Sequence, residues 1–177
     1  KAISENPNSI ETYRALTTLY VEWNSIEKAK EIYEEVIKRE PNIQLLNLEY
    51  ANCLLKVGET GKAIEIFNSV LKNDKKNLVA LNGLANGYRL DGNFTEAIKI
   101  FKAIIKNDEN NIKAYTGLAN CEKFTENKNK FIVKMESLIK TKPDTAGYFA
   151  LGKIHDDLKL YDKAIEYYRK GNNLKNN

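Results

Sequence analysis

The sequence is poor in the residue types that most often carry chemistry. Its 177 residues include one histidine, two cysteines, one methionine and three prolines. Two cysteines cannot form the disulfide framework of a small secreted domain. No zinc-ligand spacing, glycine-rich phosphate loop or Ser-His-Asp order is present. We therefore expect no metal and no cofactor, and we expect that the chain itself is not an enzyme.

Long hydrophobic runs and a strong excess of one charge are also missing. No stretch approaches the roughly 18 consecutive apolar residues of a membrane span. Residues 1–7 contain no apolar signal-peptide region and the chain has no initiator methionine, which favours a cytoplasmic segment of a longer protein. The net charge of +4 is low for a dedicated nucleic-acid binder, so nucleic-acid binding is disfavoured.

What the sequence does contain is a regular period of about 34 residues. Ala29, Ala63 and Ala97 are evenly spaced at this period, and each is followed four positions later by Tyr33, Phe67 or Phe101. The same pair recurs as Ala164 and Tyr168, which follow Ala97 and Phe101 by two periods minus one residue. Apolar residues at helical spacing predict two amphipathic helices in each unit.

Residues that start and stop helices recur with the same period. Gly58 and Gly92, with Asn24 one unit earlier, are predicted to end the first helix of a unit in a left-handed conformation. The candidate N-caps of first helices are Asn42, Asn77, Asn111 and Asp144.

This pattern resembles the tetratricopeptide repeat (TPR), which pairs a large fourth residue with a later alanine and aromatic residue. The resemblance implies an all-α, right-handed TPR superhelix, an α-solenoid of about five helix-turn-helix repeats. It spans the chain as one solenoid: residues 1–9 are the end of a preceding repeat, followed by repeats 10–43, 44–77, 78–111, 112–144 and 145–177.

The fourth repeat departs from the motif. Phe131 replaces the small alanine and Met135 replaces the aromatic residue. We expect the bulky phenylalanine to splay this helix pair or to shift its packing. His155 occupies an aromatic packing position in the fifth repeat, and we expect it to be a core histidine rather than a catalytic base.

The resemblance places ligand binding on the concave face formed by the first helices. Asn52, Asn86 and Asn120 share one register, so stacked repeats would align their amides to hold the backbone of an extended peptide. Asparagine is frequent here, at 22 of 177 residues, so periodicity alone also accounts for the alignment. The complete set of candidate groove residues is Arg14, Asn52, Lys56, Asn82, Asn86, Arg89, Lys113, Asn120, Lys123, Phe149 and Lys153.

Acidic residues at groove positions are fewer than basic ones, which predicts a partner protein or peptide that is extended or acidic. The acidic residues are chiefly Glu11, Glu22, Asp156 and Asp157. A solvated charged face is the alternative interpretation of the same lysines. Removal of flanking repeats exposes apolar surface at the ends of a solenoid segment, so truncation alone would account for dimerisation through these ends. The primary function that we predict is therefore a protein–protein interaction scaffold.

A second hypothesis makes the chain a non-catalytic, substrate-presenting arm of a larger enzyme. The last repeat begins Phe149-Ala150-Leu151-Gly152-Lys153 and ends Gly171-Asn172-Asn173-Leu174-Lys175. This combination is similar to the final repeat before the catalytic domain of bacterial TPR-containing sulfotransferases. The resemblance implies that Phe149 and Lys153 could dock a following domain.

Overall fold

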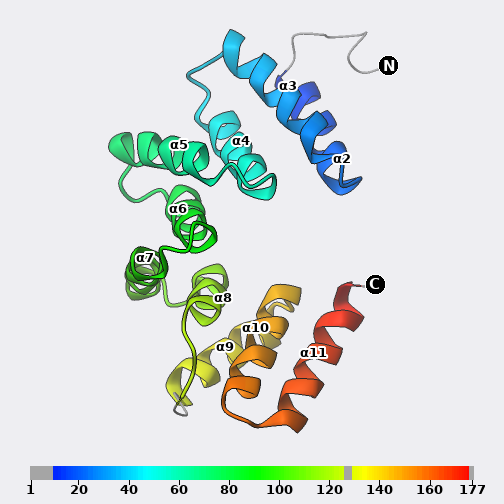
Figure 1. The fold of residues 1–177 in the computed structure, drawn as a ribbon, viewed down its shortest axis with the longest axis vertical. Helices are drawn as coiled ribbons and strands as arrows, with labels where there is room; N and C mark the ends of the chain where they lie inside the picture. The colour runs from blue at the N-terminus through cyan, green and yellow to red at the C-terminus, as the bar shows by residue number, and fades with distance from the viewer. Residues whose placement is uncertain (1–9, 126–128, 176–177) are drawn as a thin grey trace. The chain divides into compact units, whose positions relative to one another are not determined.

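A computed structural model describes residues 10–125 and 129–175, and these residues form helices and turns (Figure 1). The predicted end of a preceding repeat, residues 1–9, lies outside the described residues. The ten helices of the described part are α2 (Ile10–Glu22), α3 (Ile26–Arg39), α4 (Gln44–Lys56), α5 (Thr60–Asn73), α6 (Leu78–Leu90), α7 (Phe94–Asn107), α8 (Ile112–Cys121), α9 (Asn129–Thr141), α10 (Thr145–Asp157) and α11 (Tyr161–Lys175). The predicted all-α class is confirmed.

The helices group into two units, Lys1–Gly92 and Asn93–Asn177. In the first unit, α2 packs against α3, α4 against α5, and α6 against both α4 and α5. In the second unit, α7 packs against α8, and α10 contacts α8, α9 and α11. We call α2, α4, α6, α8 and α10 first helices, and the helix that follows each of them a second helix.

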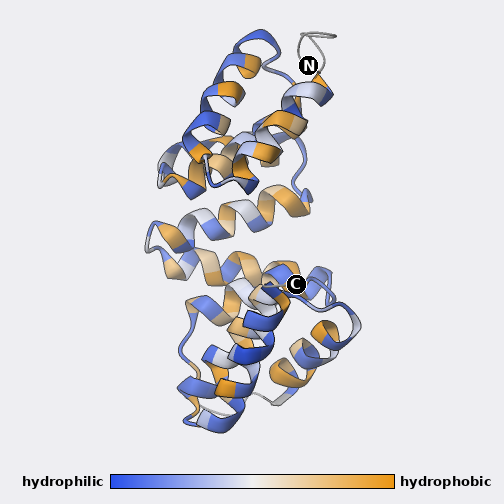
Figure 2. Cartoon of the chain, turned by 90° about the vertical axis from the view of Figure 1, so that its right-hand side faces the viewer, coloured by the Kyte–Doolittle hydropathy of each residue, from blue (hydrophilic) through white to orange (hydrophobic). Residues whose placement is uncertain are grey.

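The periodic alanines and aromatic residues form the core. Ala29, Ala63 and Ala97 are fully buried, as are the rings of Phe67 and Phe101. Apolar and polar residues alternate around each helix, so apolar stripes face neighbouring helices (Figure 2). A small residue at the alanine position lets the paired helices approach each other closely.

Four turns between paired helices contain a residue with a positive φ, and three of them share a hydrogen-bonding pattern. Gly58 and Gly92 have φ values of 83° and 81°, and Asn24 has a φ of 55°, as predicted. Lys159 occupies the same place in the fifth repeat, with a φ of 62°. In the first, second and fifth repeats the following residue donates its N–H to the carbonyl five residues earlier, which ends the helix in a Schellman-like turn.

The predicted N-caps are correct at three places of four. Asn77, Asn111 and Asp144 accept hydrogen bonds from the backbone N–H three residues later, at 3.0, 3.1 and 2.6 Å. Asn42 is not a cap, because α4 begins one residue later than expected and its N-cap residue is Ile43. Ile43, rather than Asn42, lies one full period before Asn77, so the prediction for Asn42 was out of register.

The fourth repeat packs differently from the others, as its sequence predicts. Its first helix, α8, is only 10 residues long and contacts α9 less than it contacts α10. The ring of Phe131 lies 5.0 Å from that of Tyr115 and 5.5 Å from that of Phe124. Phe124, from the segment after α8, is 1% exposed, and Met135 is fully buried. Aromatic packing therefore replaces the close helix approach that alanine permits elsewhere.

None of the helices described is both long and apolar enough to span a bilayer.

Candidate functional site

Arg14 lies on the first-helix face of unit 1, but it is already bound. Its guanidinium donates hydrogen bonds from Nε and Nη2 to the Glu49 carboxylate in the next repeat, at 3.0 and 2.7 Å from Oε1. This hydrogen bond and the negative charge of Glu49 raise the pKa of Arg14. The pair is bidentate and links α2 to α4. This ion pair was not predicted from the sequence, because Arg14 is the fifth residue of its repeat whereas Glu49 is the sixth residue of the next one.

The other candidate cations of unit 1 have no carboxylate partner. Lys56, at the end of α4, is exposed, and Arg89, near the end of α6, is half-buried. Among the described residues, neither forms an ion pair; Arg89 instead donates from Nε to Asn86 Oδ1 at 3.3 Å. Their charges are therefore open to an external anion.

The three candidate asparagines of unit 1 differ in accessibility. Asn52 is exposed and donates one N–H to the Leu48 carbonyl at 2.9 Å. Asn86 is half-buried. Asn82 is 8% exposed and donates to the Leu78 carbonyl, so it lies within the helix packing rather than on its surface. The accessible amides of this unit are thus Asn52 and Asn86.

In unit 2, the candidates on and after α8 are accessible. Lys113, Asn120 and Lys123 are exposed, and neither lysine has a carboxylate partner in the described part of the chain. Asn120 is the residue of the unit that shares the register of Asn52 and Asn86.

The two candidates on α10 are held by internal contacts. Lys153 forms an ion pair with Asp157 at 2.6 Å, donates to the Glu122 carbonyl, and lies 5.6 Å from the centre of the Phe124 ring. Asp157 in turn accepts a hydrogen bond from the Phe124 N–H at 3.0 Å. We call this group of contacts the α10 clamp. It fixes the segment that follows α8 onto α10.

The ring of Phe149 packs within its own repeat. Its centre lies 6.3 Å from that of Tyr168, and its edge closes over Gly171, where an added Cβ would lie 3.3 Å away. Tyr168 also covers Gly152. The opening and closing segments of the last repeat, including the residues that resemble sulfotransferase arms, therefore pack on each other.

The predicted core position of His155 is confirmed. The side chain is 2% exposed and its ring centre lies 5.1 Å from that of Tyr167. Its Nδ1 lies 2.8 Å from the Leu151 carbonyl, which can only accept, so Nδ1 carries the proton. Across the described ranges, no cluster of three His, Cys, Asp or Glu side chains could hold a metal ion.

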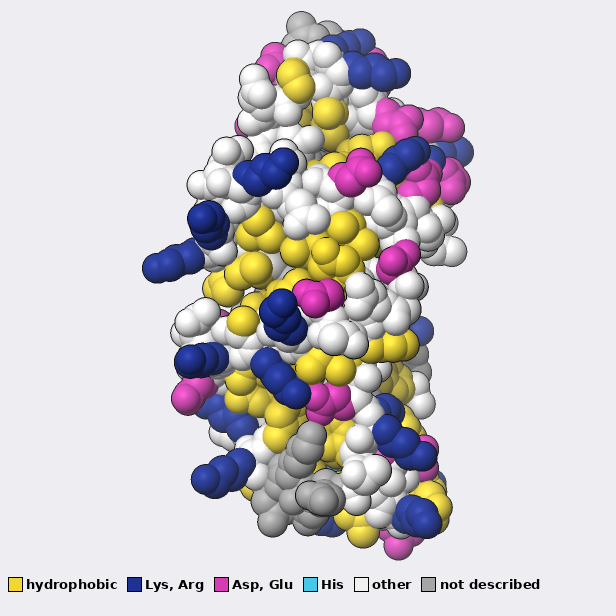
Figure 3. All heavy atoms as spheres, turned by 60° about the vertical axis from the view of Figure 1, so that its left-hand side comes forward, with side chains coloured by type: hydrophobic (Ala, Val, Ile, Leu, Met, Phe, Trp, Pro, Cys, Tyr) yellow, Lys and Arg dark blue, Asp and Glu magenta, His cyan; other side chains and the backbone are white. Residues whose placement is uncertain are grey.

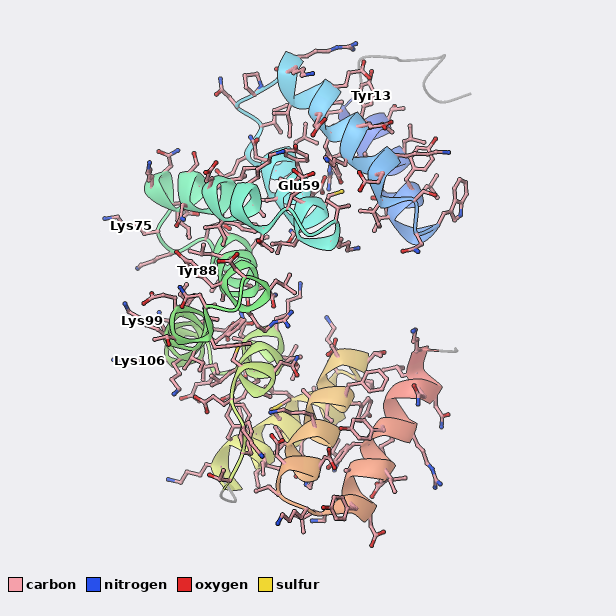
Figure 4. The ribbon with its side chains drawn as sticks, viewed as in Figure 1. Tyr13, Glu59, Lys75, Tyr88, Lys99 and Lys106 are labelled. Carbon is pink, nitrogen blue, oxygen red and sulfur yellow. The ribbon has the colours of Figure 1, made fainter. Side chains whose placement is uncertain are left out.

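Lysines are not confined to the first-helix face. Lys75 follows α5, and Lys99 and Lys106 project from α7 into solvent (Figure 4). The face in Figure 3 likewise carries many separated Lys and Arg side chains around hydrophobic areas. The first helices of unit 1 thus combine unpaired cations with accessible amides, and Lys113, Asn120 and Lys123 give unit 2 the same combination.

Comparisons with known proteins identify the repeat. Three family models described as tetratricopeptide repeat match residues 24–86, 80–113 and 146–177. A search of the curated proteins gave no match.

Solved structures share the fold at low sequence identity. A tetratricopeptide repeat protein from Parabacteroides merdae superposes with a TM-score of 0.81 and 21% identity, over 97% of this chain and 68% of its own. TTC0263, a thermophilic TPR protein of Thermus thermophilus, gives 0.77 and 14% over 92% of this chain and 90% of its own. MamA from Desulfovibrio magneticus gives 0.62 and 19% over 94% of both chains.

Proposed function

Because the chain belongs to the tetratricopeptide repeat family, we propose that it is a protein–protein interaction scaffold that binds an extended partner segment along its first helices, without catalysis of its own. The observation that carries this proposal is the surface formed by Asn52, Lys56, Asn86 and Arg89 on α4 and α6. These side chains are exposed or half-buried, and neither cation is neutralised by a carboxylate among the described residues.

The chemistry of this surface favours an extended segment with acidic groups. An amide can donate to a peptide carbonyl and accept from a peptide N–H, so Asn52 and Asn86 can hold a backbone whatever its side chains are. Lys56 and Arg89 add attraction for a carboxylate, either acidic side chains or a chain terminus. Asn120, Lys113 and Lys123 supply the same types of group in unit 2.

A binding experiment with variants tests this proposal. Peptides selected on the wild-type chain from a library of extended acidic sequences serve as the probe. The double variant Asn52→Ala/Asn86→Ala should weaken their binding by about tenfold, from the loss of two hydrogen bonds at about 1 kcal/mol each or somewhat less. Isothermal titration calorimetry measures the affinity, and circular dichroism shows that helicity is retained.

The matched control is Lys72→Ala/Asn107→Ala, two exposed residues on the second helices α5 and α7. This variant should bind the selected peptides as the wild type does. Equal affinities for all three proteins would contradict the proposal, since the contacts would then not involve the first-helix face.

The alternative, a substrate-presenting arm of a TPR-containing sulfotransferase, rests on the sequence resemblance of the last repeat. Phe149 contacts Tyr168 and Gly171, and Lys153 belongs to the α10 clamp. Internal packing is thus sufficient to explain these residues, and no observation favours the alternative over the scaffold.

A further inference from the structure

The second repeat lacks the large side chain that the other four repeats have at their fourth residue. The fourth residue of the repeat is Tyr13, Leu81, Tyr115 or Tyr148, but in the second repeat it is Asn47. Asn47 folds back over its own helix start, where Nδ2 donates to the carbonyls of Pro41 and Ile43 at 2.9 and 3.2 Å. The space that a large side chain occupies in the other repeats is therefore not filled by Asn47.

A pocket of about 260 Å³ is present at this place in unit 1. It lies between the loop before α4, the first turn of α4 and the last turns of α5. Pro41, Ile66 and Val70 supply its apolar part, and the remaining wall is polar and uncharged. The lining residues are Pro41, Asn42, Gln44, Asn47, Ile66, Ser69, Val70 and Asn73.

The other repeats show what this space accommodates. Tyr13 packs against the cluster that contains Val36, and its hydroxyl lies 3.4 Å from Arg39 Nη1. Val36 and Arg39 occupy the repeat positions of Val70 and Asn73, one period earlier. Tyr148 similarly stacks on Tyr167, which occupies the repeat position of Ile66. A tyrosine ring in the pocket would thus lie on Val70 and Ile66 with its hydroxyl near Asn73.

We infer that this pocket binds a tyrosine side chain presented by a partner protein, in the place where the other repeats insert a residue of their own. The apolar residues take the ring, and Asn73 and Ser69 offer hydrogen-bonding groups to the hydroxyl. Asn42, in the loop before α4, and Gln44, the first residue of α4, are exposed and can hold the peptide groups on either side of the tyrosine. The absence of charged side chains from the wall disfavours a phosphorylated or carboxylated ligand.

The pocket is separate from the surface proposed above for the extended segment. It lies at the start of α4, whereas Lys56 is the last residue of that helix. The two proposals can therefore fail independently.

The variant Asn47→Tyr tests the inference from inside the fold, because it fills the pocket with the chain's own side chain. Burying the ring should raise Tm by about 3 °C or more. The control Asn107→Tyr places a tyrosine at an exposed helix position outside both proposed sites, the last residue of α7, and its Tm should stay within about 1 °C of that of the wild type. A lower Tm for Asn47→Tyr would overturn the inference, since the pocket would then not have the shape of a tyrosine.

Binding is measured with N-acetyl-L-tyrosinamide as the probe, by amide chemical shifts of the full chain. Shifts are expected at Asn47, Ser69 and Asn73 in the wild type and in Asn107→Tyr, and none at the corresponding amides of Asn47→Tyr. N-acetyl-L-phenylalaninamide, which lacks the hydroxyl, should bind about fivefold more weakly. No shifts in the wild type, or equal shifts in Asn47→Tyr, would show that the space is only a gap in the packing.

Discussion

The second and fourth repeats join the next repeat in two different ways, although they share one sequence period. After the second repeat, the ring of Phe67 lies directly on Gly83 of α6. The same contact recurs between Phe101 and Gly117 of α8. After the fourth repeat, no aromatic ring occupies this position; Met135 takes it, and Phe124, Phe131 and the α10 clamp supply the packing.

The difference shows what the period requires and what it leaves free. A phenylalanine that meets a glycine allows two helices to approach closely with complementary shapes, and each residue then depends on the other. Where the phenylalanine is lost, that dependence is lost as well. An unbranched methionine fills the irregular space, and an ion pair with a cation–π contact fixes the connecting segment.

The largest effect on stability is expected from disturbing the contact between Phe67 and Gly83, which joins the second repeat to the third. In Gly83→Ala, the new Cβ would lie 2.3 Å from Phe67 Cζ. Because the ring is fully buried and cannot move aside, α6 must shift, at a cost of about 3 kcal/mol. Urea denaturation monitored by circular dichroism measures the change in the free energy of unfolding.

Two further variants separate shape from helix propensity. Gly61→Ala in α5 meets nothing within 4 Å, so it should be neutral or stabilise by up to about 1 kcal/mol. Phe67→Leu should recover part of the loss when it is combined with Gly83→Ala, because the smaller side chain makes room for the methyl group. If the two substitutions changed the free energy of unfolding additively, the proposed mutual dependence of Phe67 and Gly83 would be contradicted.

The sequence predicted this regular part of the fold well. Ala29, Ala63 and Ala97, together with the aromatic residues four positions later, mark the close helix contacts without reference to the rest of the chain. The turn residues Gly58 and Gly92 are similarly local signals, since a left-handed conformation selects glycine. Features that depend on a single residue type at a fixed spacing are therefore predictable.

An intermediate effect is expected from the α10 clamp of the fourth and fifth repeats. Burial of Asp157 acts to raise the pKa of its carboxyl, but the Lys153 ammonium and the Phe124 N–H outweigh this, and the pKa is lowered. The lowered pKa stabilises the fold above the unfolded value of about 3.9, and this contribution is lost as the pH falls through the folded pKa.

Asp157→Asn should therefore unfold about 2 kcal/mol more easily than the wild type at pH 7, because it weakens a charged hydrogen bond. The difference should narrow as the pH falls below about 4, where the carboxyl of the unfolded wild type takes up a proton, and should vanish as the pH falls through the lowered pKa of the folded protein. Unfolding in urea at pH 7, 5 and 3 measures this. Asp156→Asn is the control, an exposed neighbour on the same helix, and should unfold as the wild type does at each pH. A constant difference at all three pH values would exclude the ionic origin.

Contacts between repeats were harder to predict from the sequence. Arg14 and Lys153 were expected in an open groove, but their partners Glu49 and Glu122 come from other repeats or from an irregular segment. The buried position of Phe124 follows from the shortening of α8, which no local pattern specifies. Asn47 could have been noticed, since it is the one small polar residue at a position otherwise occupied by tyrosine or leucine. That its amide would turn back onto the backbone depends on the geometry of the preceding loop.

The smallest effect concerns the turn that closes the first helix of the fifth repeat. Lys159 adopts a φ of 62°, where the second and third repeats use Gly58 and Gly92. A left-handed conformation costs a residue with a Cβ about 1 kcal/mol, so Lys159→Gly should stabilise the protein by about that amount or less. Lys159→Ala removes the charge but keeps the Cβ, and its free energy of unfolding should equal that of the wild type within about 0.5 kcal/mol. If alanine stabilised the protein as much as glycine does, the gain would come from the charge and not from the backbone. The fifth turn would then not share the conformational cost that explains the glycines of the regular repeats.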